Sequence, residues 1–224
     1  MSYDLIVFDW DGTLMDSMAA IVKAIQQSAL DLGIRYPSEA EARSVIGLGL
    51  IEAFQLVWPE LERERYPDLV NAYRQNYLAK DGDLEFFPGV LEMLAELKEM
   101  GKTLAVATGK SRIGLERAMA RTNAAEFFTT TRTGDDCLSK PNPQMLEEIM
   151  TETGFSFENT LMVGDSIHDL LMANTAKVPA IAVTYGAFTK DVLKTAHPVA
   201  ICDSVVQLRQ ILKQKGTTKD AKSC

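Results

Sequence analysis

The chain has few cysteines, no long apolar run and no excess of positive charge, and each shortage excludes a class of protein. Its three cysteines are far apart and form no C-x-x-C pair, which argues against a disulfide framework and a structural zinc site. The apolar runs are far shorter than a membrane span, and the first residues do not resemble a signal peptide. A formal net charge of −8 argues against a nucleic-acid binder, whose contact face is normally basic.

These shortages favour a protein of the reducing cytoplasm that has neither a nucleic acid nor a membrane as a partner. Apolar residues make up 46% of the chain and charged residues 24%, which is ordinary for a globular protein. A length of 224 residues suits one large domain, or one domain that carries a smaller insert. The polar stretch over 214–224 is expected to be a flexible tail, and both a monomer and a dimer remain open.

Short apolar runs of the β type alternate with amphipathic helical patterns along most of the chain. The predicted strands are Leu5–Phe8, Thr103–Ala107, Phe127–Thr131, Leu161–Val163, Ala180–Val183 and Val199–Ile201. One helical pattern runs from Val90 to a stop at Gly101, and another opens at Pro141 and Pro143 and ends at Gly154. Alternating strands and helices predict an α/β fold, with a parallel sheet covered by helices on both faces.

The stretch from Ser17 to Gly82 breaks this alternation, because it holds helical patterns and no convincing strand. Ser17 is expected to cap a first helix, Ile51–Val57 predicts a second, and the spacing from Leu69 to Lys80 predicts a third. We therefore expect a small helical domain inserted into the sheet domain. The expected division is 1–16 and 83–213 for the core and 17–82 for the insert.

Two carboxylates, Asp9 and Asp11, come directly after the first predicted strand. Residues i and i+2 at a strand end point to the same side, so both side chains would face one space. Two like charges held close together are costly unless a cation or a shared proton compensates. A plain turn is the alternative, because Asp-Gly is a common turn dipeptide. The functional interpretation is a metal-dependent or acid–base site at the mouth of the sheet.

More polar groups follow the later strands, where an open parallel sheet binds its ligands. Thr108 follows the second strand, Asp165 and Asp169 follow the fourth, and Lys140 precedes the helix that the prolines open. Each has an ordinary alternative: a helix cap for Thr108, a solvated surface lysine for Lys140, and a first-turn helix acid for Asp169. Their joint placement at one edge of the sheet favours a single site.

Four segments, in this order and spacing, resemble the motifs of the haloacid dehalogenase superfamily of phosphotransferases. They are Asp9-x-Asp11-Gly12-Thr13-Leu14-x-Asp16-Ser17, Thr108-Gly109-Lys110, Lys140-Pro141-x-Pro143 and Gly164-Asp165-Ser166-x-x-Asp169. The resemblance covers about residues 3–205 and is nearest to phosphoglycolate phosphatase-like enzymes. It implies a Rossmann-like, doubly wound core, a helical cap of the family's first type and a dependence on Mg²⁺.

The resemblance also implies a phosphomonoester hydrolase that acts on a small phosphorylated metabolite through an aspartyl-phosphate. Asp9 would be the nucleophile, and Asp11 the general acid for the leaving alcohol and then the base for water. Mg²⁺ would be held by Asp9, by the backbone carbonyl of Asp11 and by Asp165. Asp169 would bind the metal through water or support the other ligands.

The phosphoryl oxygens would be bound by Thr108, Gly109 and Lys140. We expect Thr108 and Gly109 to lie where a helix begins, which is a natural anion site, and Lys140 to pair with Asp9. The family often has Asn where this chain has Gly109, so that side-chain contact is absent or replaced. Lys110 either reaches the substrate or lies on the surface.

Substrate specificity is expected to reside in the cap, where the residue-level signals are weak. Gly47 and Gly49 suggest a turn that dips towards the site, and Arg43 could read a substrate carboxylate, although a solvated Arg on a helix face is the ordinary alternative. His168 is interpreted as a flanking residue rather than a metal ligand. Cap movement would use hinges near Met15–Ser17 and 81–87.

Two other functions remain open at this point. A hexose-phosphate mutase would use the same site if the cap excluded water, and a non-catalytic regulator could share the scaffold. A dehalogenase is disfavoured, because it needs no metal and has no acid at the position of Asp11. A phosphonate-cleaving relative would need a cap lysine, and Lys23 is interpreted as an ordinary helix-face residue.

Overall fold

A six-stranded parallel sheet forms the centre of the computed structural model, which describes residues 3–213 without the side chains of residues 80 and 81. The strands are β1 Leu5–Phe8, β2 Thr103–Ala107, β3 Thr130–Arg132, β4 Thr160–Gly164, β5 Ala180–Val183 and β6 Ala200–Cys202. Their order is β3-β2-β1-β4-β5-β6, which is the doubly wound, Rossmann-like order. The predicted α/β fold is therefore confirmed. The predicted tail over 214–224 lies outside the described residues.

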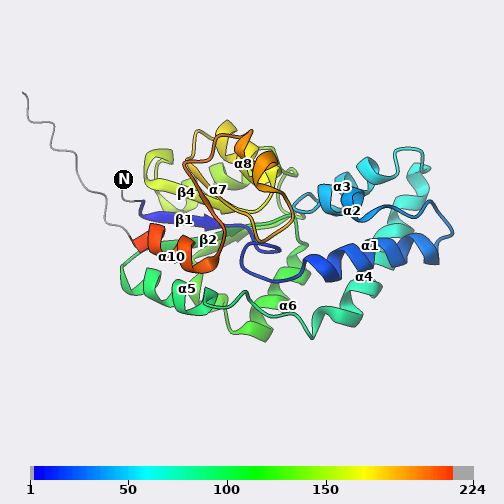
Figure 1. Ribbon diagram of the computed structural model, residues 1–224, viewed down its shortest axis with the longest axis horizontal. Helices are drawn as coiled ribbons and strands as arrows, with labels where there is room; N and C mark the ends of the chain where they lie inside the picture. The colour runs from blue at the N-terminus through cyan, green and yellow to red at the C-terminus, as the bar shows by residue number, and fades with distance from the viewer. Residues whose placement is uncertain (1–2, 214–224) are drawn as a thin grey trace, which may run out of the picture.

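Helices cover both faces of this sheet (Figure 1). The core helices are α5 Val90–Glu99, α6 Arg112–Thr122, α7 Gln144–Thr153, α8 Ile167–Thr175, α9 Lys190–Lys194 and α10 Val205–Lys213. Side chains alternate along a strand, so Ile6 and Phe8 of β1 pack with α5, α6 and α10, while Leu5 and Val7 pack with α7, α8 and α9. Burial on both faces explains why the strands of this sheet are continuous apolar runs.

The inserted segment is helical, and it projects from one end of the sheet (Figure 1). Its helices are α1 Met18–Asp31, α2 Glu39–Ser44, α3 Leu50–Val57 and α4 Tyr66–Asp81, with a 3₁₀ turn, η1, at Arg63–Arg65. An aromatic cluster joins α3 to α4, since Phe54 meets Trp58 and Tyr73 edge to face. We refer to this helical segment as the cap, and residues 17–82 remain our proposal for its extent.

The two connections between cap and core run side by side. Asp16 N–H donates to Glu85 O, and Phe87 N–H donates to Leu14 O, both at 2.9 Å. Met15 and Phe86 form an isolated antiparallel bridge between these bonds. The cap leaves the core only a few residues after β1, so it lies next to the edge of the sheet where the strands end. The hinges proposed near these connections remain a prediction.

Three details of secondary structure differ from the sequence prediction. The strand predicted at Phe127–Thr131 is wrong in its first half: Ala125–Phe127 is a 3₁₀ turn (η2), and its aromatic side chain packs against the core. The last strand begins one residue later than predicted, at Ala200, and Val199 before it is 59% exposed. α2 was not predicted, since it has no apolar period; a capping box between Ser38 and Glu41 begins it instead.

Two further features complete the fold. A second 3₁₀ turn in the core, η3 at Phe157–Asn159, leads into β4. Both tryptophans are buried: Trp10 packs edge to face on Phe86 and Phe128 beside the sheet, and Trp58 lies in the cap. Within residues 3–213, no helix is both long and apolar enough to cross a membrane.

Candidate active site

Two buried carboxylates follow the first strand at the edge of the sheet. Asp9 continues the strand ladder, because its N–H donates to Val163 O at 2.9 Å. Asp11 follows in a tight turn made by Gly12, which has a φ of +86°. A Cβ at Gly12 would lie 2.3 Å from Asp165 Oδ2, so glycine is required by space as well as by conformation. The Asp-Gly turn, which was the plain alternative in the sequence, is therefore present at the candidate site.

Lys140 joins two of the predicted acids inside the protein. Its Nζ lies 2.7 Å from Asp9 Oδ1 and 2.6 Å from Asp169 Oδ1, and its side chain is fully buried. The ordinary alternative, a solvated surface lysine, is therefore wrong. Burial alone would lower the pKa of Lys140, but the charges of Asp169 and Asp9 outweigh it and raise this pKa. The ammonium group thus stays charged between the two carboxylates.

Asp169 serves the fold and the site with different oxygens. Its Oδ2 accepts hydrogen bonds from Ser166 N–H and Oγ–H at 3.1 and 2.6 Å, in a capping box that begins α8. Its Oδ1 accepts the bond from Lys140. Asp169 is therefore a first-turn helix acid, which was the ordinary alternative, and it also contacts Lys140 at the candidate site. The capping box fixes the direction in which Oδ1 points.

Asp165 is held by two donors from different loops. Thr13 Oγ1 donates to its Oδ1 at 3.0 Å, and Ala187 N–H donates to its Oδ2 at 2.6 Å. Burial, followed by the charge of Asp169, raises the pKa of Asp165 to about 7. Burial also raises the pKa of Asp9 well above its usual range, although Lys140 acts in the opposite direction. The cluster therefore resists holding all of its negative charges without a further cation.

The donor set fits a hard divalent cation. Asp9, Asp165 and Asp169 each offer a carboxylate oxygen, and these atoms all lie within 4.8 Å of one another. Among the described residues, the buried Asp9 Oδ2 has no hydrogen-bond partner, which is rare for a buried polar atom. Three carboxylates and the Lys140 ammonium leave two negative charges in excess. Oxygen ligands and this charge suit Mg²⁺.

Thr108 and Gly109 lie beside the acids, but not at a helix start as predicted. Thr108 is 1% exposed, and its Oγ1 accepts a hydrogen bond from Lys110 N–H at 3.2 Å. α6 begins only at Arg112, and its cap is Ser111, whose Oγ accepts from Gly114 N–H at 3.2 Å. The expectation failed because Thr108 directly follows β2, and a short loop separates it from α6.

The cap loop 47–49 presses on Gly109. A Cβ at Gly109 would lie 2.3 Å from Leu48 O and 2.5 Å from Gly47 O, so the asparagine common at this position in the family would not fit this arrangement. Gly49 N–H donates to Ser139 Oγ of the core at 2.9 Å. Gly47 adopts a φ of +96° in the turn between α2 and α3. The structure thus brings the predicted cap turn to the site.

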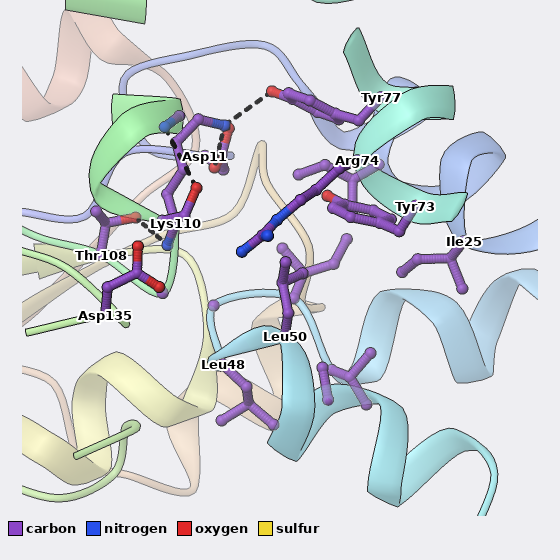
Figure 2. Close-up of a pocket in the computed structure, with 18 of the residues that line it drawn as sticks. Asp11, Ile25, Leu48, Leu50, Tyr73, Arg74, Tyr77, Thr108, Lys110 and Asp135 are labelled. Atoms are coloured by element: carbon purple, nitrogen blue, oxygen red, sulfur yellow. Dashed lines mark hydrogen bonds and ion pairs between the residues drawn. The ribbon is translucent and has the colours of Figure 1, made fainter. Parts of the chain in front are cut away.

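Lys110 bridges the core and the cap (Figure 2). Its Nζ donates to both carboxylate oxygens of Asp11, at 3.0 and 3.2 Å, and to Tyr77 Oη of α4 at 2.9 Å. The Tyr77 ring centroid lies 4.4 Å from the same nitrogen. Ser17 occupies the N-cap position of α1, as predicted, but its side chain makes no cap hydrogen bond. Its Oγ donates instead to Asp11 Oδ1 at 2.7 Å. Asp11 is therefore oriented by a hydroxyl and an ammonium group.

Two other predicted residues lie elsewhere. Arg43 forms an exposed i,i+4 ion pair with Glu39 at 2.8 Å on α2 and is not among the residues that line the cavity, which corrects the expectation that it reads a substrate carboxylate. His168 Nε2 lies 3.0 Å from Ser44 O at the end of α2, so this flanking residue is also a contact between core and cap.

A cavity of about 210 Å³ separates the sheet edge from the cap (Figure 2). Asp9, Asp11 and Thr108 line its core side, and side chains of α1, α3 and α4 line its cap side. Sequence reasoning placed Tyr73 and Tyr77 on a helix without assigning them a role, and it overlooked Arg74 of the same helix. No motif marks these residues; only the packing of α4 over the sheet edge turns them towards the cavity.

A family model described as haloacid dehalogenase-like hydrolase matches residues 6–183. Among curated proteins, a probable phosphatase IndB of Dickeya dadantii is 39% identical over 207 residues, with 89% of each chain covered. A phosphoglycolate phosphatase of Agrobacterium fabrum is 29% identical, with 97% of this chain and 95% of that protein covered.

A solved structure has the same fold. It is that of a haloacid dehalogenase-like hydrolase from Bacteroides fragilis, which superposes with a TM-score of 0.86 at 23% identity. The match covers 92% of this chain and all of that one. This likeness concerns the arrangement of core and cap.

Proposed function

Since the chain belongs to the haloacid dehalogenase-like hydrolases, we propose that it is a Mg²⁺-dependent phosphomonoester hydrolase that works through an aspartyl-phosphate on Asp9. Membership of the family agrees with the motifs of the sequence, and the curated relatives reported above are named as phosphatases. The observation that carries the proposal is the environment of Asp9. This carboxylate is buried, one oxygen is fixed by Lys140, and the other has no partner among the described residues.

The first step transfers the phosphoryl group to the protein. Asp9 attacks phosphorus, and the bond from phosphorus to the alcohol oxygen breaks. Asp11 gives its proton to that oxygen, so that the alcohol leaves uncharged. Lys140 and the Thr108 hydroxyl are proposed to bind the phosphoryl oxygens as charge develops on them. The hydrogen bonds that hold these side chains before substrate arrives spare the reorganisation that free groups would need.

The second step hydrolyses the aspartyl-phosphate and regenerates the Asp9 carboxylate. Asp11, now ionised, takes a proton from water, and the resulting hydroxide attacks the phosphorus of the aspartyl-phosphate. The bond between phosphorus and the Asp9 oxygen breaks, which releases inorganic phosphate. Lys110 and Ser17 hold Asp11 in position for both proton transfers.

Asp9, Asp165 and the backbone carbonyl of Asp11 are proposed to hold Mg²⁺, with Asp169 in support. When bound, this cation would reduce the repulsion between the anionic nucleophile and the anionic ester. Without it, the excess negative charge around Asp9 would oppose the approach of a phosphate ester. The expected cytoplasmic setting stays part of the proposal, since the described cysteines Cys137 and Cys202 are both free thiols.

The test measures phosphate release from a panel of phosphate esters with Mg²⁺, with EDTA, and with the Asp9→Asn variant. We expect metal-dependent release that falls by about 10⁴-fold or more in the variant, because the nucleophile is lost. Asp191→Asn is the matched control, since this carboxylate is 92% exposed and does not line the cavity. Circular dichroism would check that both variants are folded.

Two results would contradict the proposal. Isomerised sugar phosphate without net phosphate release would indicate a mutase. The absence of turnover with every ester, from a folded protein loaded with Mg²⁺, would favour a non-catalytic regulator.

A further inference from the structure

The cavity has two chemically different ends. Its core end is lined by the carboxylates Asp9 and Asp11 and by Thr108. Its cap end is formed by Ile21 and Ile25 of α1, Phe54 of α3 and Tyr73 of α4, together with neighbouring apolar side chains. A phosphate group bound at the core end would direct the alcohol part of the ester into this apolar end.

Aromatic rings make up one wall of the apolar end, as Figure 2 shows for Tyr73 and Tyr77. These two rings are stacked, with centroids 5.8 Å apart and planes at 22°. Phe54 packs edge to face on Tyr73 at 5.7 Å. A cluster of aromatic rings of this kind gains most contact from a planar ring packed against it. An aliphatic acid of two carbons would leave most of this wall uncovered.

Arg74 supplies a cation to the apolar end. It lines the cavity, and Figure 2 shows its guanidinium end extending from α4 towards the side where Thr108, Lys110 and Asp135 lie. In the part of the chain that the structure describes, Arg74 forms no ion pair or hydrogen bond. Asp135 is engaged elsewhere, since its Oδ2 accepts from Arg112 N–H at 2.7 Å.

A second basic group that lines the cavity, Lys110, is already occupied. The Lys110 ammonium group already donates hydrogen bonds to Asp11 and Tyr77. Arg74 therefore keeps its planar fork of donors for a ligand, and this geometry suits carbonyl and carboxylate acceptors.

Building on the proposed phosphatase function, we propose that the preferred substrate is a phosphate monoester whose alcohol carries a planar ring with an oxygen acceptor. The ring would lie against the Tyr73–Tyr77 wall, and the acceptor would bind Arg74. A pyrimidine nucleoside monophosphate represents this chemistry, because its base is planar and carries carbonyl oxygens. Phosphoglycolate lacks the ring, although its carboxylate could also bind Arg74.

Four esters separate these contributions. Uridine 5′-monophosphate has the ring and the acceptors, ribose 5-phosphate lacks the ring, phenyl phosphate has a ring without an acceptor, and phosphoglycolate has an acceptor without a ring. We expect kcat/KM to be highest for uridine 5′-monophosphate. The advantage over ribose 5-phosphate is expected to be about 10-fold or more, from ring contacts and one charge-assisted hydrogen bond together.

Two variants test which residues cause the expected substrate preference. Arg74→Met should lower the ratio of kcat/KM for uridine 5′-monophosphate to that for phenyl phosphate by about 10-fold. Tyr73→Leu keeps an apolar side chain but removes the ring, so it should lower the ratio of uridine 5′-monophosphate to ribose 5-phosphate by about 3- to 10-fold. Arg63→Met is the matched control, since Arg63 is exposed on the cap and does not line the cavity.

The outcomes distinguish this inference from the proposed function. If every ester is hydrolysed but phosphoglycolate or ribose 5-phosphate is preferred, the inference is overturned and the phosphatase function stands. An equal loss for all four esters in Arg74→Met would mean that Arg74 binds the phosphate, which also overturns the inference. If wild type hydrolyses none of them or any other ester, the proposed function itself fails.

Discussion

The sheet edge and the cap wall face each other across one cavity, yet they are built differently. At the sheet edge, the acids are held by side-chain hydrogen bonds and ion pairs. Lys140 pairs with Asp9, and Thr13 donates to Asp165. On the cap wall, apolar side chains pack together, and Arg74 has no partner among the described residues.

This difference follows from what each region must bury. Charged groups without water are costly unless they are paired and hydrogen-bonded, so the sheet edge tolerates few substitutions. Apolar surfaces need mainly volume and shape, and swaps that conserve volume are tolerated. On the proposed function, the sheet edge would determine the reaction and the cap wall the choice of substrate.

The largest effect on stability is expected from breaking the most tightly paired part of the sheet edge. Lys140→Met removes the ammonium between Asp9 and Asp169 and leaves two buried carboxylates without their cation. In EDTA at about pH 7 the free energy of unfolding should fall by about 3–5 kcal/mol. Urea unfolding would measure it. Lys23→Met, an exposed lysine on the cap, should change stability by less than about 0.5 kcal/mol. Equal effects of the two changes would contradict the comparison.

An intermediate effect should appear when pH is varied in the absence of metal. The pKa of Asp165 is about 7 in the folded protein, against 3.8 for the free side chain, so the folded state binds more protons between these values. Stability must then fall as pH rises through this window. The melting temperature of the EDTA-treated protein should drop by several degrees, at roughly 2–4 °C for each kcal/mol.

Asp165→Asn and added Mg²⁺ test the origin of that slope. Both remove the cost of ionising Asp165, so each should flatten the decline between about pH 4 and pH 7. A decline of unchanged steepness in Asp165→Asn would show that other groups cause it. Asp203→Asn, which removes an exposed carboxylate paired with Lys190, is the matched control.

The smallest effect is expected at the bridge that joins the two regions. Tyr77→Phe keeps the ring over Lys110 but removes the hydroxyl that accepts from its Nζ. We expect a loss of about 0.5–1.5 kcal/mol in the free energy of unfolding. Tyr36→Phe, which alters an exposed tyrosine, should change nothing measurable. A loss at Tyr77 no larger than at Tyr36 would mean that this contact contributes nothing to the docking of the cap.

The sequence predicted the central strands well because each carries its own signal. β1, β2 and β5 match the predicted bounds, since a strand buried on both faces is a short unbroken apolar run. Edge strands have a weaker signal, and β3 and β6 were accordingly displaced. At the site, we predicted from the motifs that Lys140 pairs with Asp9. The structure confirms this contact.

Contacts between segments that are distant in the chain could not be predicted from the sequence. The pairing of Lys110 with Tyr77 joins residues 33 positions apart, and the direction of Arg74 depends on how α4 packs across the sheet edge. The packing around Gly109 could not be predicted from the sequence either. Its role becomes visible only once the carbonyls of Gly47 and Leu48 are seen to occupy the space of a side chain. Tertiary packing decides such details, and helical periodicity does not report them.

One tryptophan lies in the core and the other in the cap, so the protein has a fluorescent side chain on each side of the cavity. Trp10 stands in the chain between Asp9 and Asp11, while Trp58 closes α3 in the cap, with its Nε1–H donating to Arg35 O. Both indoles are almost fully shielded from solvent. In a Trp58→Phe protein, the remaining emission would come from the sheet edge alone, so events at the acids could be followed separately from movements of the cap.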